Sequence, residues 1–277
     1  MINLNGQLIP SEEAKVGLNN RAFNYADAVF ETLKIRNGQP LFFESHYFRL
    51  MANMRICRME IPNHFTPEQL LFEIFDLVKA QAINCSNSRV KILVFRDAEG
   101  LYVPAANEVG YCITIQPIAE SDYPLNLSQY KVDIFKDYLV PSGLLSTVKT
   151  TNRMVNILAG IFAKENDLDN CLLLNTQKNV IEALNGNVFL VFDKIIKTPK
   201  LSEGCLNGIM RSHLIELAPK CGYKVEEVAV SPFEIQQADE MFFTNIIQGL
   251  RPVTNFRKKE FNTVCAQTLI EALNSSL

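Results

Sequence analysis

Two Asn-Gly pairs constrain the fold of this 277-residue chain most strongly. Asn5-Gly6 and Asn37-Gly38 each lie between apolar or alternating runs. Asn-Gly readily adopts the positive backbone φ angles that a two-residue turn between antiparallel strands requires. The chain is therefore predicted to open with antiparallel sheet.

Periodicity along the rest of the chain predicts two mixed α+β units. The polar, proline-bearing stretch 119–124 is the best linker, which gives an N-terminal domain over 1–118 and a C-terminal domain over 125–277. The predicted helices span 45–58, 67–82, 152–164, 208–220 and 262–273. The predicted strands span 89–96, 111–117, 131–138, 171–175 and 187–192.

Composition narrows the class of protein. A hydrophobic content of 48% is ample for a buried core, and a formal charge of −3 disfavours a nucleic-acid surface. The start of the chain lacks a signal-peptide pattern and no stretch is apolar for long enough to cross a bilayer, so a cytoplasmic protein is expected. Seven scattered cysteines and three histidines in no ligand spacing suggest neither disulfides, a metal site nor a serine triad.

Lys149 is the strongest catalytic candidate. It lies in the segment 146–153, and Glu182 begins a second polar segment further along the chain. A lysine beside apolar residues can lose its proton near neutral pH and form a Schiff base with an aldehyde. A carboxylate on the far side of the same aldehyde cofactor would complete an electron sink. Read alone, a lysine is far more often an ordinary solvated charge, so the assignment depends on its partners.

A second candidate segment spans 199–211, where Gly204 and Gly208 precede a predicted helix. Glycine allows close approach of the backbone to a ligand, and the first N–H groups of a helix form an anion site. A phosphate could therefore dock on Gly208, Ile209 and Met210. The alternative is a plain loop leading into a helix.

Five segments, in order, resemble the class IV aminotransferases, the fold-type IV pyridoxal-phosphate enzymes. They are 23–31, 46–50, the segments of Lys149 and Glu182, 204–211, and 238–253. The resemblance covers nearly the whole chain. It implies an α+β fold with a smaller N-terminal α/β sandwich and a larger C-terminal pseudo-barrel that binds pyridoxal phosphate.

The resemblance also implies residue roles. Lys149 would be the Schiff-base lysine and the base that moves the proton at the substrate Cα, Glu182 would pair with the pyridine nitrogen, and Arg49 would bind the phosphate. The other implied cofactor-binding residues are Asn187, Gly208, Ile209, Met210, Thr244, Asn245 and Ile246. The substrate-binding candidates are Phe30, Lys34 and Arg96. His46, at a predicted helix start, is expected to cap or pack.

Residues at which this chain departs from the family pattern help to distinguish between the family's subgroups. Leu101 and Val103 replace the Arg-x-His carboxylate trap of D-amino acid aminotransferases, which argues against that activity. Met154 replaces a tyrosine, and Ile246 a threonine, of branched-chain enzymes. Arg96 aligns with a carboxylate-binding arginine of those same enzymes. The stretch 149–153, ending in Asn-Arg, and Asn245 resemble aminodeoxychorismate lyase instead.

The sequence thus predicts a pyridoxal-phosphate aminotransferase that moves an amino group from an amino acid, with branched-chain substrates one option, to a 2-oxo acid. One alternative is a lyase that releases pyruvate and 4-aminobenzoate from aminodeoxychorismate. A third is a protein that binds the cofactor without turnover. Family membership implies a homodimer, with no metal, nucleic-acid or membrane partner.

Overall fold

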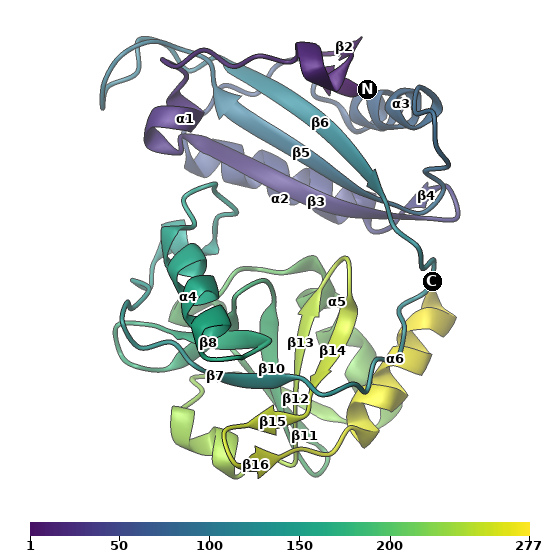
Figure 1. Ribbon diagram of the computed structural model, residues 1–277, viewed down its shortest axis with the longest axis vertical. Helices are drawn as coiled ribbons and strands as arrows, with labels where there is room; N and C mark the ends of the chain where they lie inside the picture. Colours follow the sequence, from purple (N-terminus) through teal and green to yellow (C-terminus); the bar gives the residue numbers. More distant parts are fainter. The chain divides into compact units, whose positions relative to one another are not determined.

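The computed structural model describes residues 1–277, and the chain forms two compact units (Figure 1). The first unit comprises 1–121 together with 148–152, and the second comprises 122–147 with 153–277. The sequence-based division at 119–124 placed 148–152 in the C-terminal domain. This short segment instead pairs with a strand of the first unit, so Lys149 belongs to that unit.

The first unit is built on one six-stranded antiparallel sheet with the strand order β2-β1-β6-β5-β3-β4. The two predicted Asn-Gly hairpins are confirmed, because Asn5-Gly6 joins β1 to β2 and Asn37-Gly38 joins β3 to β4, all four residues with positive φ. The elements are β1 Ile2–Leu4, β2 Gln7–Ile9, η1 Ser11–Glu13, α1 Arg21–Tyr25, β3 Ala28–Arg36, β4 Gln39–Pro40, α2 Phe43–Ile56, α3 Pro67–Lys79, β5 Ser88–Arg96 and β6 Val109–Pro117.

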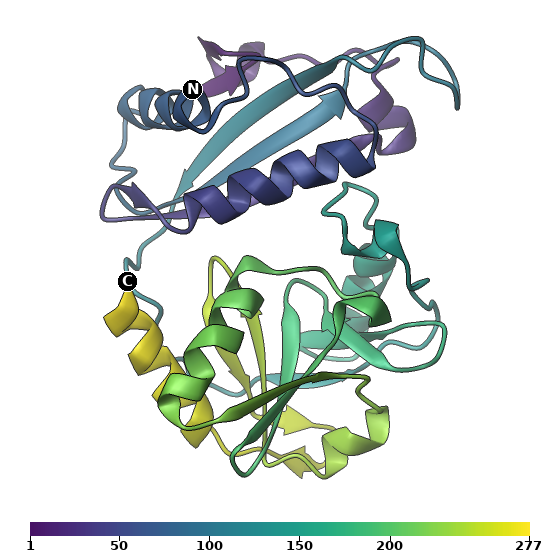
Figure 2. The same cartoon turned by 180° about the vertical axis from the view of Figure 1, so that it is seen from behind.

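Helices α2 and α3 cover one face of this sheet, as Figure 2 shows. Strand alternation places Val29, Leu33 and Ile35 of β3 on that face, where they join Leu50 and Leu77 of the helices in one core. The residues between them along β3, Phe30, Thr32 and Lys34, therefore point to the opposite face.

The second unit contains two five-stranded sheets, ordered β12-β11-β10-β13-β14 and β16-β15-β7-β8-β9. Its strands are β7 Lys131–Ile134, β8 Asn170–Leu174, β9 Val180–Ala183, β10 Asn187–Phe192, β11 Ile195–Pro199, β12 Lys224–Val228, β13 Glu240–Asn245, β14 Gly249–Val253, β15 Asn255–Phe256 and β16 Lys259–Glu260. Its helices are η2 Leu144–Thr147, α4 Met154–Glu165, η3 Leu201–Glu203, α5 Ile209–Leu217, η4 Ala218–Cys221, η5 Pro232–Gln236 and α6 Val264–Ser276. No helix of the protein is both long and apolar enough to cross a bilayer.

One hydrophobic core draws on both sheets of the second unit. Val132 and Leu172 of one sheet pack in the same cluster as Val188, Met241 and Val253 of the other. This arrangement, with the mixed content of the whole chain, confirms the α+β prediction.

Several predicted boundaries differ from the structure by a few residues. The strand predicted over 131–138 ends at Ile134, and the helix predicted over 208–220 ends at Leu217 and continues as the short η4 turn. The helix predicted from 152 begins at Met154. It starts later because 148–152 is extended and bonded to β3.

Candidate active site

Lys149 lies on an extended segment beside β3. The Phe30 N–H donates to the Lys149 carbonyl at 2.9 Å, and the Thr151 N–H donates to the Ala28 carbonyl at 3.0 Å. Val148 packs into the core on the helix-covered side, so the Lys149 side chain points to the other face of the sheet. Its Nζ lies 4.4 Å from the centroid of the Phe30 ring. Backbone pairing and this ring contact together fix the position of the ammonium group.

Arg49 is held by the buried carboxylate of Glu31, a residue for which the sequence predicted no role. Its Nε donates to Glu31 Oε1 at 2.7 Å and its Nη2 to Glu31 Oε2 at 2.6 Å, a bidentate pair between α2 and β3. His46 Nδ1 lies 2.8 Å from Glu31 Oε2. Because an ionised carboxylate only accepts, Nδ1 carries the proton. His46 was expected to cap or pack, and it also donates a hydrogen bond that orients the Glu31 carboxylate.

Burial and charge oppose each other in this cluster. Burial would raise the pKa of the Glu31 carboxyl, but the charge of Arg49 and the hydrogen bonds from Arg49 and His46 lower that pKa to about 2. The pKa of His46 falls below its ordinary value, because burial of the ring outweighs the hydrogen bond and the charge of Glu31, which raise that pKa. The charges of Arg49 and Lys149 lower it further. Glu31 is therefore ionised, and His46 is neutral, at pH 7.

The remaining cofactor candidates lie in the second unit. Glu182, on β9, is 8% exposed, and its Oε2 accepts from the Leu206 N–H at 3.1 Å. Asn187, at the start of β10, donates from Nδ2 to the Leu206 carbonyl at 2.7 Å. Both side chains therefore fix the loop that leads into α5.

Gly208 is the N-cap residue of α5, as predicted, and Ile209 and Met210 form its first turn. A Cβ at Gly208 would overlap Asn187 Oδ1, so glycine is required for this close approach. Thr244 lies opposite Asn187 across β10 and β13. Its hydroxyl is buried and has no hydrogen-bond partner within the protein.

Asn245 and Ile246 shape the loop after β13. Asn245 Oδ1 accepts from the N–H groups of Ile247 and Gln248 at 3.0 and 2.9 Å, a local turn cap. The Ile246 carbonyl accepts from the buried Tyr123 hydroxyl at 2.8 Å. The loop conformation is thus set by bonds within the second unit.

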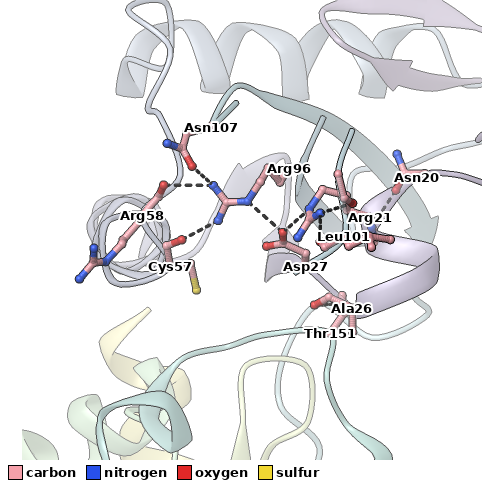
Figure 3. Close-up of polar contacts among 12 residues, drawn as sticks. Asn20, Arg21, Ala26, Asp27, Cys57, Arg58, Arg96, Leu101, Asn107 and Thr151 are labelled. Carbon is pink, nitrogen blue, oxygen red and sulfur yellow. Dashed lines mark hydrogen bonds and ion pairs between the residues drawn. The ribbon is translucent and has the colours of Figure 1, made fainter. Parts of the chain in front are cut away.

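Arg96 lies at the centre of a polar network in the first unit (Figure 3). It is 6% exposed, and its guanidinium donates to Asp27 Oδ2 at 2.9 Å, to the carbonyls of Arg58 and Cys57, and to Asn107 Oδ1. Arg21 donates to the same Asp27 oxygen at 2.8 Å. Four of the five N–H donors of Arg96 are thereby bonded to the protein. A role in substrate binding for Arg96 stays a prediction.

Replacement of Arg96 by methionine is expected to lower the free energy of unfolding by about 3 kcal/mol, because buried carbonyls and Asp27 lose their donors. Urea unfolding measures this change. An exposed arginine, Arg55→Met on α2, is the control and should unfold like the wild type. An Arg96 variant of wild-type stability with a raised substrate KM would instead favour the sequence-based role.

The family model described as "Amino-transferase class IV" matches residues 28–256. The chain belongs to the class IV aminotransferases. The match spans both units and contains every candidate site residue, from Phe30 to Ile246.

Individual relatives show the same breadth of similarity. The chain is 26% identical over 259 residues to a Methanocaldococcus jannaschii protein named as a branched-chain-amino-acid aminotransferase, covering 91% of this chain and 86% of that one. It is 26% identical to the aminodeoxychorismate lyase of Vibrio harveyi, over 90% of both chains. The fold matches the PLP form of the branched-chain aminotransferase of Thermobaculum terrenum with a TM-score of 0.86, at 24% identity over 99% of this chain and 92% of that one.

Proposed function

We propose that this protein is a pyridoxal-phosphate aminotransferase that moves an amino group from an amino acid to a 2-oxo acid. The position of Lys149 is the main support for this proposal. Lys149 lies within the region that the family model matches, its backbone is hydrogen-bonded to β3, and its side chain contacts the Phe30 ring. A fixed amine suits repeated proton transfer at one substrate atom, since general-base catalysis depends on position.

Each unit, taken by itself, offers residues whose chemistry suits pyridoxal phosphate. Thr244 offers a buried hydroxyl that has no partner in the protein. The α5 N-terminus offers N–H groups beyond a glycine that permits close approach, a combination suited to phosphate. Glu182 is a nearly buried carboxylate suited to a protonated ring nitrogen. Arg49 adds a cation oriented by Glu31.

We assign roles on this basis. When bound, pyridoxal phosphate withdraws electrons from the Cα–H bond of an amino acid. Lys149 would hold the cofactor through Nζ and would move the proton at the substrate Cα. Glu182 would keep the ring nitrogen protonated, and Arg49, Ile209, Met210 and Thr244 would hold the phosphate.

A lyase is the second candidate function. Asn152 and Arg153 after the lysine, and Asn245 in the late loop, favour it, together with the similarity to the Vibrio harveyi lyase over 90% of the chain. Both reactions begin with proton removal at Cα by the lysine, so the cofactor-binding residues do not separate them.

An amino acid panel tests the proposed function. Single amino acids, added to the cofactor-loaded protein without any oxo acid, should convert the bound cofactor to its pyridoxamine form, seen as loss of visible absorbance. No conversion, with pyruvate released from aminodeoxychorismate, would move the assignment to the lyase. Cofactor binding with neither reaction would indicate the non-catalytic alternative.

We further propose that the enzyme is a cytoplasmic homodimer. Met154, Ile157 and Ile161 lie three and four residues apart along α4 and are all exposed. Residues at this spacing share one side of a helix, and an exposed apolar patch is typical of an interface. Light scattering on the purified protein gives the mass of the assembly.

A further inference from the structure

Tyr123 is buried, although it lies in the segment 119–124 that the sequence predicted to be a linker. Its side chain is only 2% exposed and is among the largest fully buried side chains of the chain. The second unit begins at Asp122, so Tyr123 belongs to that unit. A tyrosine is usually buried this deeply only where its hydroxyl finds a hydrogen-bond partner. The partner of Tyr123 is a loop that the proposed function assigns to the cofactor.

Helix α6 fixes the backbone of Tyr123. Asn274, in the last turn of that helix, donates from Nδ2 to the Tyr123 carbonyl at 2.9 Å. The Tyr123 N–H donates to Asn274 Oδ1, also at 2.9 Å. The chain passes the C-terminal end of α6 at this point (Figure 1). Because one planar amide bonds both backbone groups, the direction in which the Tyr123 side chain leaves the backbone is set by α6.

The Tyr123 ring packs on the loop 246–248 that joins β13 to β14. Gly249 ends this loop with a φ of +68°, and a Cβ at that position would lie 2.5 Å from Tyr123 Cγ. Glycine is therefore required twice, for the positive φ and for the contact with the ring. The ring lies directly against the loop backbone as a result.

The peptide unit between Ile246 and Ile247 is held at both of its polar groups. The Tyr123 hydroxyl donates to the Ile246 carbonyl at 2.8 Å, and the Ile247 N–H donates to Asn245 Oδ1 at 3.0 Å. Since a peptide unit is planar, these two bonds fix the orientation of the plane. Asn245 belongs to the loop itself, whereas Tyr123 comes from a segment more than a hundred residues earlier. The bond from Tyr123 thus ties the loop to a separate part of the second unit.

This loop follows directly on Thr244, whose buried hydroxyl has no partner in the protein. Thr244 and Ile246 are both candidates for contact with the cofactor's phosphate. Hydrogen bonds to an anion weaken steeply when the donor is misplaced or misdirected. Movement of the Ile246 peptide plane would therefore weaken the hold on the phosphate.

We propose that Tyr123 is a positioning residue for the cofactor's phosphate. Its hydroxyl holds the loop after β13 in the conformation that receives the phosphate, and it acts through the Ile246 carbonyl. This inference rests on the proposed function and adds to it a residue from the segment predicted to be a linker. Loss of the hydroxyl weakens the binding of the phosphate group and leaves the reaction of the aldehyde with Lys149 unchanged.

Two forms of the cofactor test the inference: pyridoxal phosphate, and pyridoxal, which keeps the aldehyde but lacks the phosphate. Absorbance titration of the cofactor-free protein gives the Kd of each. The wild type should bind pyridoxal phosphate more tightly. Tyr123→Phe should raise the Kd of pyridoxal phosphate about fivefold, the scale of one hydrogen bond, and leave that of pyridoxal within about twofold. A purely structural defect would weaken both alike.

Tyr130→Phe is the matched control, because it removes a hydroxyl that accepts from Asn170 Nδ2 at 3.1 Å, and it should bind both forms like the wild type. Asn274→Ala releases the Tyr123 backbone and should show the same selective loss as Tyr123→Phe. It decides the question if Tyr123→Phe does not fold.

Equal weakening of both forms by Tyr123→Phe, or an unchanged Kd of pyridoxal phosphate in the folded variant, would overturn the inference and leave the proposed function standing. A wild-type protein that binds the two forms equally would contradict the phosphate site and, with it, both proposals.

Discussion

Replacing Lys149 with alanine is expected to reduce the rate of amino-group transfer by at least about 10³-fold, the scale of a positioned general base. The variant loses the amine that holds the cofactor and removes the Cα proton. It should still fold, because the segment 148–152 pairs with β3 through backbone bonds that alanine retains. Single-turnover absorbance measurements with an amino acid report the rate, and thermal unfolding reports stability.

Lys136→Ala, an exposed lysine of the second unit, is the matched control and should react like the wild type. Added methylamine should restore part of the activity of the Lys149 variant, as a soluble base in place of the side chain. A Lys149→Ala enzyme that turns over at more than about a tenth of the wild-type rate would remove the lysine from the mechanism.

Glu31 is expected to make the first unit sensitive to acid. Its pKa is about 2 in the folded protein against an ordinary value near 4.5, so protonation favours the unfolded chain. The stability that the Glu31 carboxylate contributes is fully present above about pH 4.5 and is lost as pH falls toward 2. A shift of this size corresponds to about 3 kcal/mol.

Glu31→Gln should therefore be about 3 kcal/mol less stable than the wild type at pH 7, since Arg49 keeps its charge but loses its partner. The difference should shrink between pH 4.5 and pH 2. Urea unfolding across this range measures the difference, with Glu44→Gln, an exposed residue of α2, the helix that carries Arg49, as control. A constant difference at every pH would show that packing, not charge, accounts for the loss.

The Glu31→Gln variant also tests cofactor binding separately from folding stability. Because Glu31 bonds two nitrogens of Arg49, its loss should let the guanidinium move and weaken phosphate binding. The cofactor should dissociate faster from Glu31→Gln even where the variant is fully folded. Ultrafiltration followed by absorbance gives the retained fraction.

Local sequence signals predicted much of this fold. The Asn-Gly turns fixed two hairpins because their residues accept positive φ. Thr66 and Pro67 mark the start of α3, where the Thr66 hydroxyl accepts from the Gln69 N–H. The Gly208 helix start was likewise readable from the sequence alone.

Features that depend on pairing between distant segments could not be predicted from local sequence signals. Lys149 was expected in the C-terminal domain, yet its segment bonds to β3, more than a hundred residues earlier. Glu31 ends the segment 23–31 that resembles the family, but the sequence predicted no role for it. Its role follows from the alternation of β3, which turns it toward α2 and Arg49. The alternation itself can be seen in the sequence, but only after β3 is recognised as a strand.

The network around Arg96 was not predicted: its guanidinium donates to Asp27 and to backbone carbonyls of distant segments, and its role in substrate binding stays a prediction.

The most direct test of the central claim is reductive trapping of the cofactor. Purified protein is mixed with pyridoxal phosphate, reduced with borohydride, digested and analysed by mass spectrometry. The account predicts one pyridoxyl group per chain, on the peptide that contains Lys149, and none in the Lys149→Ala variant. A colourless protein without the adduct, or stoichiometric labelling of a different lysine, would contradict it.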